Sequence, residues 1–332
     1  MSQLSSAAVD LVEVIRGDTV ESVHRGHAVI CDGAGQIIEA WGDPATMIYP
    51  RSSCKMIQAL PLLESGAGRA LSTAQLALAC ASHQGAAIHS EAVAHWLADM
   101  GLGEADLRCG THMPYAEEAR DDLVRAGKEP CQLHNNCSGK HAGFLMLSQH
   151  LGAGPEYVEV DHPVQRAIRT AFEEATEMDS PGYGIDGCSA PNFLTRLDAL
   201  AGAVGRFARA REGQGTRQDA MARLTHAMGA FPEMVAGEGR ACTDLMRAMK
   251  GKGAVKTGAE AVFVAILPEL DRGIALKIVD GTTRASEAVI AALLSRIGAL
   301  DAKDPVVERL TMGPIRNRRD MVTGRYNVVL GS

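Results

Sequence analysis

Segments with strand-forming character crowd the two ends of the chain, whereas segments with helical spacing fill its middle. The strand-forming segments are short aliphatic runs separated by turns that contain glycine and aspartate. They are residues 11–15, 20–23, 28–31, 37–41, 261–267 and 274–279, with 326–330 as a last short strand. Strands at both ends of a chain usually meet in one sheet, because separate hairpins would leave long unpaired edges. We therefore predict one antiparallel sheet built from both chain ends.

The middle of the chain carries the helical pattern. The predicted helices are 74–80, 90–100, 163–177, 192–211 and 215–228, followed by a late helix at 286–297 whose expected N-cap is Ser286. The predicted fold class is therefore α/β (α+β), an antiparallel sheet flanked by helices with a mostly helical middle region. We expect a single domain over residues 1–332. Its sheet subdomain would comprise about 1–50 and 250–332, and its helical middle about 51–249.

The composition excludes several classes of function. Hydrophobic residues make up 46% and charged residues 22% of the 332 positions, which suits a soluble protein with a sizeable core. A net charge of -7, with no basic run that contains aromatic residues, argues against a nucleic-acid partner. Residues 1–10 lack the features of a signal peptide, and no apolar stretch is long enough to cross a membrane. We expect a cytoplasmic protein without a membrane partner, whose eight cysteines are thiols or metal ligands.

The segment Arg51-Ser52-Ser53-Cys54-Lys55 stands just before an apolar run. If a helix begins at Ser52, Lys55 lies one turn away on the same face, so its amine can reach the hydroxyl. Ser53 would point almost the opposite way. A neutral amine can take the proton of a serine that is otherwise a poor nucleophile. The alternative is an exposed helix N-cap followed by a solvated lysine.

A second fragment, Lys256-Thr257-Gly258, comes directly before the apolar segment 261–267 and is expected to open that strand. Ser-x-x-Lys early and Lys-Thr-Gly late form the pattern of serine acyl-transferases such as β-lactamases and penicillin-binding proteins. The strand would place its backbone beside an acyl group while Lys256 adds positive charge. Alone, the fragment is equally typical of a turn with a solvated lysine.

Three further segments carry polar groups next to apolar runs. Ser82, in Ala81-Ser82-His83, is a candidate second hydroxyl for a proton relay, or part of a turn that ends a helix. Cys137 and Cys188 each stand at an expected helix start, where thiolate is favoured. Two thiolates suit zinc, which would need a third protein ligand and a water.

Ordinary ligand preference would select a histidine as the third zinc ligand, either His134 or His141. Lys140 is an unusual donor, because a lysine must be neutral to bind a metal. Buried free thiols without any metal remain the alternative explanation for both cysteines.

Five ordered blocks together resemble the L-asparaginase II family, the Rhizobium-type asparaginases. They are residues 51–58, 81–83, 136–141, 186–191 and 256–258, and the resemblance spans nearly the whole chain. It implies a fold like that of serine β-lactamases and glutaminases. It also implies hydrolysis of L-asparagine to L-aspartate and ammonia (L-asparaginase, EC 3.5.1.1) by a homodimer.

The resemblance also assigns roles to residues of this chain. The catalytic residues would form two Ser–Lys pairs, Ser52 with Lys55 and Ser82 with Lys256. The implied Zn²⁺ ligands are Cys137, Lys140 and Cys188, completed by water. The implied substrate-binding residues are Arg51, Asn136, Asp186 and Thr257.

The expected mechanism begins with Lys55 as the base that deprotonates Ser52, which attacks the side-chain amide. Burial and the cation Lys256 would favour a neutral Lys55 amine. Ser82 and Lys256 would relay a proton to the departing ammonia, and water would then release aspartate. We expect zinc to support substrate binding rather than to polarise the amide.

Three alternatives stay open from the sequence. A glutaminase or broader amidohydrolase would share every motif, since the two amides differ by one methylene. A β-lactamase-like acyl-transferase would react with penicillins instead. A zinc- or amino-acid-binding sensor on an enzyme-derived scaffold is the non-enzymatic reading.

Overall fold

The computed structural model describes residues 3–331, and its residues cluster into two compact units. The sheet unit comprises 1–53, 195–209 and 244–332. The helical unit comprises 54–194 and 210–243. The segment 195–209, which the sequence analysis placed in the helical middle, belongs to the sheet unit.

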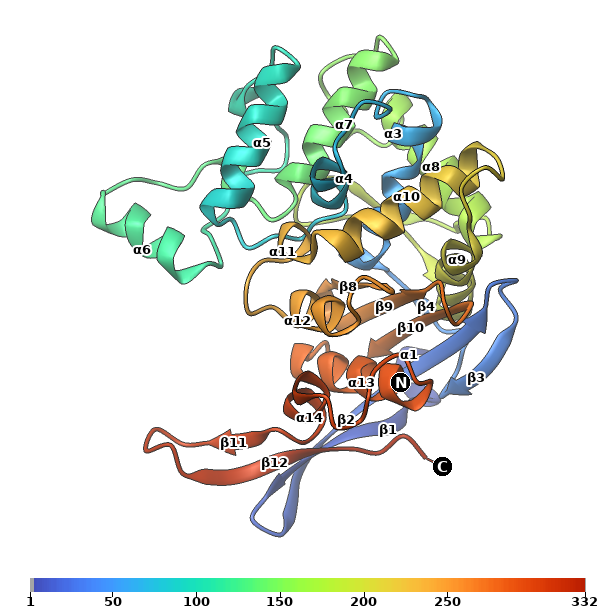
Figure 1. Cartoon of the computed structure of the whole chain (residues 1–332), viewed down its shortest axis with the longest axis vertical. Coiled ribbons are helices and arrows are strands. Elements are labelled where there is room, and N and C mark those ends of the chain that lie inside the picture. Colours follow the sequence, from blue (N-terminus) through green and yellow to red (C-terminus); the bar gives the residue numbers. More distant parts are fainter. Residues whose placement is uncertain (1–2, 332) are drawn as a thin grey trace. The chain divides into compact units, whose positions relative to one another are not determined.

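Strands from both chain ends form one sheet in the sheet unit (Figure 1). Its strands are β1 (Val9–Arg16), β2 (Thr19–Asp32), β3 (Ile37–Trp41), β8 (Ala254–Gly258), β9 (Val262–Leu267), β10 (Arg272–Ile278), β11 (Pro314–Arg316) and β12 (Val322–Val328). The order is β11-β12-β1-β2-β10-β9-β8, with β3 also paired to β2, and every pair is antiparallel. The prediction of one antiparallel sheet built from both chain ends is confirmed.

The central strands are covered on both faces. β9 is buried along its whole length and β10 nearly so, as expected for strands between two helical layers. The helices that contact them are α9 (Leu197–Arg209) and α13 (Thr283–Arg296), and α14 (Pro305–Met312) packs against α13. A Cβ at Gly273 would collide with the backbone of Gly205, so α9 lies directly on the β10 backbone.

The remaining elements of the sheet unit are short. They are α1 (Gln3–Ser6), β4 (Met47–Ile48) paired with β7 (Thr195–Arg196), the 3₁₀ helix η4 (Ala259–Ala261), and the 3₁₀ helix η1 (Arg51–Cys54), whose last residue starts the helical unit. α12 (Ala241–Ala248) contains the boundary that follows Thr243.

Helices make up most of the helical unit. They are α2 (Lys55–Gln58), α3 (Leu60–Glu64), α4 (Thr73–Ala79), α5 (Ala87–Asp99), η2 (Glu104–Asp106), α6 (Glu117–Arg125), η3 (Gln132–His134), α7 (Ser138–His150), α8 (Pro163–Thr176), α10 (Thr216–Ala230) and α11 (Pro232–Val235). A two-stranded hairpin, β5 (Tyr183–Ile185) with β6 (Pro191–Phe193), completes it.

α7 is the central helix of this unit, with ten buried residues among thirteen. A Cβ on Gly139 would lie 2.5 Å from the carbonyl oxygen of Leu78, so glycine allows α7 to approach α4 closely. Within residues 3–331, no helix is both long enough and apolar enough to cross a lipid bilayer.

Three local predictions were wrong. The N-cap of α13 is Thr282, and Ser286 is buried inside the helix. The helix predicted from residue 192 begins only at Leu197, because 191–193 pair as β6 and 195–196 as β7. The segment 186–192 does not open a helix, since it forms the β5–β6 turn and the start of β6.

Candidate active site

Lys55, the first residue of α2, is a buried lysine whose amine is surrounded by hydrogen-bond partners. Its Nζ lies 3.0 Å from Ser82 Oγ and 3.1 Å from Cys137 Sγ, and it also donates to the carbonyl oxygen of Ala81. All three partners belong to the helical unit. If Lys55 is neutral, it has one lone pair, and the Ser82 hydroxyl can donate its proton to it.

The loop after α4 holds Ser82 in place. The Ser82 N–H donates to the carbonyl of Val235 at 2.9 Å, and the His83 N–H donates to the carbonyl of Asn136 at 3.1 Å. The backbone of Asn136, a sequence-predicted substrate-binding residue, therefore helps to fix this loop.

His83 connects the serine loop to the start of α7, a role that the sequence analysis missed. His83 Nδ1 accepts the Gly85 N–H at 3.1 Å, so the ring proton lies on Nε2, which donates to Ser138 Oγ at 2.9 Å. Burial lowers the pKa of His83 well below its usual value, so the ring is neutral. The ring also stacks on His89 with centroids 4.8 Å apart. The Ala81-Ser82-His83 block was the signal in the sequence that pointed here.

Ser52 lies in η1, within a strained turn of the sheet unit. The preceding residue, Arg51, has a left-handed backbone with φ of 53°. The buried Ser53 closes the turn, since its hydroxyl donates to the Pro50 carbonyl at 2.7 Å. Such strain often marks functional turns.

Lys256-Thr257-Gly258 ends β8 and does not open the following strand, so that prediction was wrong. Only two apolar residues precede Lys256 in β8, too few for a strand signal. A Cβ on Gly258 would lie 2.7 Å from Pro50 O and 3.0 Å from Ser53 N. The end of β8 therefore abuts the turn that carries Ser52. Lys256 is buried, and its Nζ donates to the carbonyl of Thr257 at 2.7 Å.

Cys137, Lys140 and Cys188 gather in the helical unit. Cys137 is the N-cap of α7, as expected for a helix start, and Lys140 follows on its first turn. Cys188 lies instead in the β5–β6 turn, so its predicted place at a helix start was wrong. Lys140 Nζ donates to Cys188 Sγ at 3.1 Å, and all three side chains are buried.

The charges in this cluster are coupled. A hydrogen bond from Cys137 holds the pKa of the Cys188 thiol well below its usual value, and Lys140 lowers it further. The same bond raises the pKa of Cys137. Burial pushes the pKa of Lys140 down, but the neighbouring Cys188 and Cys137 sulfurs outweigh it and raise that pKa. The three side chains therefore shift one another's pKa values, with Cys188 lowered and both Cys137 and Lys140 raised.

Asp186 caps the turn that carries Cys188. Its side chain accepts the Gly187 N–H at 2.7 Å, and its backbone pairs with Ala190 and Ser189. Burial lowers the pKa of Lys140, and the negative charge of Asp186 raises it, as the two cysteines do more strongly. Asp186 therefore orders the turn that carries Cys188.

A family model described as L-asparaginase II matches residues 12–328, nearly the whole chain. The chain belongs to the L-asparaginase II family. The resemblance drawn from the five sequence blocks is thereby confirmed, and membership of this family supports an amidohydrolase-type activity.

Several solved structures are similar to this L-asparaginase II family member. A β-lactamase from Mycobacterium bovis is 13% identical, with a TM-score of 0.42 over 82% of this chain and 94% of that one. A Bacteroides dorei structure whose title names a β-lactamase is 12% identical, with a TM-score of 0.46 over 82% and 92%. A structure titled "Mglu in its native form" is 14% identical, with a TM-score of 0.44 over 90% and 70%. No curated protein matches the chain.

Thiolate sulfur is a donor that zinc prefers, and the cluster holds two cysteines beside the amine of Lys140, whose Nζ lies 3.1 Å from Cys188 Sγ. Among the described residues, no three His, Cys, Asp or Glu side chains gather closely enough to hold a metal. The family resemblance gives Lys140 as the third ligand with Cys137 and Cys188, and this lysine must lose its proton to bind a metal.

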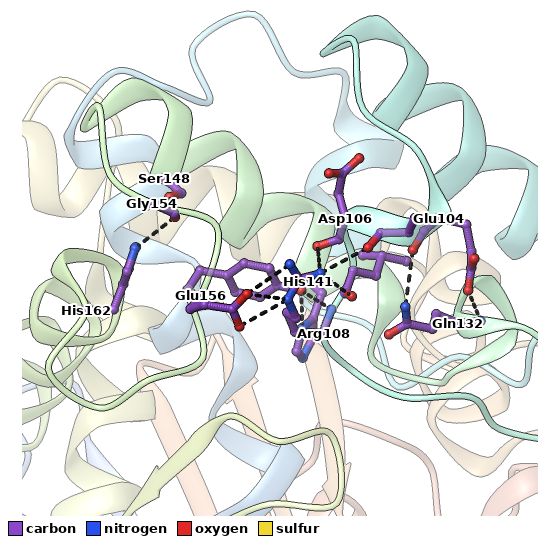
Figure 2. Close-up of polar contacts among 12 residues, drawn as sticks. Glu104, Asp106, Arg108, Gln132, His141, Ser148, Gly154, Glu156 and His162 are labelled. Atoms are coloured by element: carbon purple, nitrogen blue, oxygen red, sulfur yellow. Dashed lines mark hydrogen bonds and ion pairs between the residues drawn. The ribbon is translucent and has the colours of Figure 1, made fainter.

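The two histidines considered as zinc ligands each use Nδ1 in another hydrogen bond. His134 Nδ1 accepts the Cys131 N–H at 3.0 Å. His141 Nδ1 lies 2.8 Å from the Tyr157 hydroxyl in the network drawn in Figure 2. That hydroxyl also accepts the Arg108 N–H at 2.7 Å. Burial and the charge of Lys140 lower the pKa of His141 well below its usual value, which keeps the ring neutral.

All eight cysteines lie within the described residues, and none of them is in a disulfide bond. Cys31, Cys54 and Cys80 are buried.

Proposed function

We propose that this L-asparaginase II family member hydrolyses L-asparagine to L-aspartate and ammonia through a serine acyl-enzyme. The observation that carries the proposal is the buried Lys55 amine 3.0 Å from the Ser82 hydroxyl. A buried amine beside a hydroxyl is the arrangement that Ser–Lys acyl-transfer chemistry requires.

The proposed acylation has Ser52 as the nucleophile and Lys55 as its base. The Ser52 oxygen bonds to the side-chain carbonyl carbon, and its proton passes to Lys55. Ser82, which touches Lys55, relays a proton to the amide nitrogen, so the C–N bond breaks and ammonia leaves. Water then attacks the acyl-enzyme, releases aspartate and returns the proton to Ser52. Lys256 adds positive charge beside the acyl group.

The remaining family residues would bind the substrate. Arg51 would pair with its carboxylate, Asp186 with its α-amino group, and Thr257 and Asn136 would offer further polar contacts. Cys137, Lys140 and Cys188 would hold Zn²⁺, which supplies a fixed positive charge that anchors the substrate's amino-acid end. From the family resemblance we also propose a homodimer.

Ammonia release tests this proposal. Purified protein is assayed with L-asparagine and, side by side, with L-glutamine and a penicillin. The proposal predicts turnover of L-asparagine that Ser52→Ala and Lys55→Met abolish, with both variants folded. The matched control is Lys252→Met, which removes an exposed lysine. A clear preference for L-glutamine, or full activity of Lys55→Met, would refute the assignment.

A further inference from the structure

The turn between β8 and β9 contains two consecutive residues with left-handed backbones. Glu260 has φ of 59° and ψ of 31°, and Ala261 has φ of 55°. Neither is glycine, and such conformations cost about 1 kcal/mol or more per residue. They persist only where the surrounding structure holds them.

Lys277 holds the peptide that joins these two residues. It lies in β10 opposite Val262 of β9 and is only 7% exposed. Its Nζ donates to the carbonyl oxygen of Glu260. That oxygen belongs to the peptide unit set by ψ of Glu260 and φ of Ala261, so one hydrogen bond restrains both left-handed residues.

The Lys277 ammonium group lies in an apolar, buried strand. Burial of a charged group costs free energy unless the group is hydrogen-bonded. Burial lowers the pKa of Lys277, and the nearby cation Arg51 also acts in that direction. An aliphatic side chain would fill the same space without this cost, so the ammonium group itself serves the structure.

The turn fixes the position of β8. Among the described strands, β8 stands at the end of the sheet order, and it pairs with β9. In this pairing Gly258 faces Val262 and Lys256 faces Val264. Hairpin register follows turn geometry, so a relaxed turn would shift Lys256 along the sheet edge. There is little free space at Gly258, because a Cβ there would lie 2.7 Å from Pro50 O and 3.0 Å from Ser53 N in the turn that carries Ser52.

We propose that Lys277 is a positioning residue, which locks the Glu260–Ala261 peptide and thereby sets where the Lys256-Thr257-Gly258 strand lies against the Ser52 turn. The expected loss of L-asparagine hydrolysis rests on the proposed function. The expected loosening of the β8–β9 turn does not.

The kinetic test compares Lys277→Met, Lys277→Arg and the double variant Lys277→Met/Ala261→Gly. We expect Lys277→Met to lower kcat/KM for L-asparagine roughly tenfold or more, mainly through kcat, because misplaced groups lose reactivity steeply. Lys277→Arg keeps a donor and should retain most activity. Ala261→Gly should restore much of the loss in the double variant, because glycine adopts the left-handed backbone without help.

A matched control separates positioning from stability. Ile274→Val, in the same strand and equally buried, should lower the melting temperature but leave kcat/KM within about twofold. Should Lys277→Met fail to fold, Lys277→Gln, which keeps a shorter donor, takes its place in the series.

Hydrogen exchange provides the readout that needs no substrate. Amides of residues 254–266 should exchange faster in Lys277→Met and slow again in the double variant. In Ile274→Val, the exchange rate of these amides relative to the rest of the sheet should not change. Unaltered exchange and unaltered kcat/KM in Lys277→Met would overturn the inference. If the wild-type protein does not hydrolyse L-asparagine, the proposed function fails, and the exchange pattern still decides the role of Lys277.

Discussion

Lys55 Nζ lies 3.0 Å from Ser82 Oγ, although 27 positions separate the two residues in the chain. The sequence analysis paired Lys55 with Ser52 and Ser82 with Lys256. The contact seen in the helical unit adds a link between these two predicted pairs. In the proposed mechanism, it would let Lys55 pass a proton on to Ser82.

Ser82→Ala tests this link. Removal of the hydroxyl should lower kcat about 100-fold or more with little change in KM, because the relay acts only during proton transfer to the leaving nitrogen. Steady-state ammonia release gives both constants. Ser65→Ala, on the surface side of the helical unit, is the control and should behave as wild type. A Ser82→Ala variant that raises KM alone would identify Ser82 as a binding residue instead.

Cys188→Ser tests the metal site. We expect about one zinc per chain in the wild-type protein and a large loss in this variant, since zinc in such a site needs its soft thiolates. Elemental analysis measures the metal directly. Cys131→Ser, which changes a partly exposed thiol outside the cluster, should keep its zinc.

Chelation separates the two possible roles of zinc. If zinc anchors the substrate, its removal should raise KM for L-asparagine while kcat at saturation changes little. A fall in kcat with KM unchanged would instead indicate that zinc polarises the reacting amide.

Gly258→Ala tests the close approach of β8 to the Ser52 turn. The added Cβ would lie 2.7 Å from Pro50 O and 3.0 Å from Ser53 N, so the backbone must move, at a cost of about 1–3 kcal/mol in unfolding free energy. Activity should fall as well. Gly154→Ala, where the new methyl group meets open space, should leave stability and kcat/KM unchanged, as thermal melting and ammonia assays can check.

Thiol labelling tests the burial of Cys31. Burial, together with the charge of Asp198, raises the pKa of this thiol to about 12. At pH 8 only about 10⁻⁴ of it is thiolate, so alkylation of the native protein should be very slow and should accelerate as pH rises or the protein unfolds. Cys131, which is partly exposed, should be modified first. Mass spectrometry of labelled peptides would show the opposite order if the prediction were wrong.

The sequence predicted the sheet well, because its strands carry long aliphatic runs with clear turns between them. It missed β8, because Ala254 and Val255 alone precede the polar Lys256 and Thr257. It also placed Cys188 at a helix start, since a glycine-rich turn before an apolar stretch suits either a helix cap or a hairpin. The left-handed Ser189, with φ of 69°, belongs to the hairpin turn.

The sequence supplied candidate residues for the site, but it did not show which of their side chains contact one another. Short motifs singled out Lys55, Ser82 and both cysteines as candidates, and the family resemblance added Lys140. Which of these touch depends on the packing of α2, α4 and α7, and a linear pattern does not encode distances between helices. The role of Lys277 had no signal in the sequence, because this residue acts on a backbone group.

Trapping the acyl-enzyme tests the proposed chemistry most directly. Wild-type protein is mixed with L-asparagine, quenched in acid within milliseconds and digested, and the aspartyl ester is located by mass spectrometry. We predict the ester on Ser52, and its absence from the Lys55→Met variant. An ester on Ser82, or steady ammonia release without any ester on a serine, would contradict the mechanism.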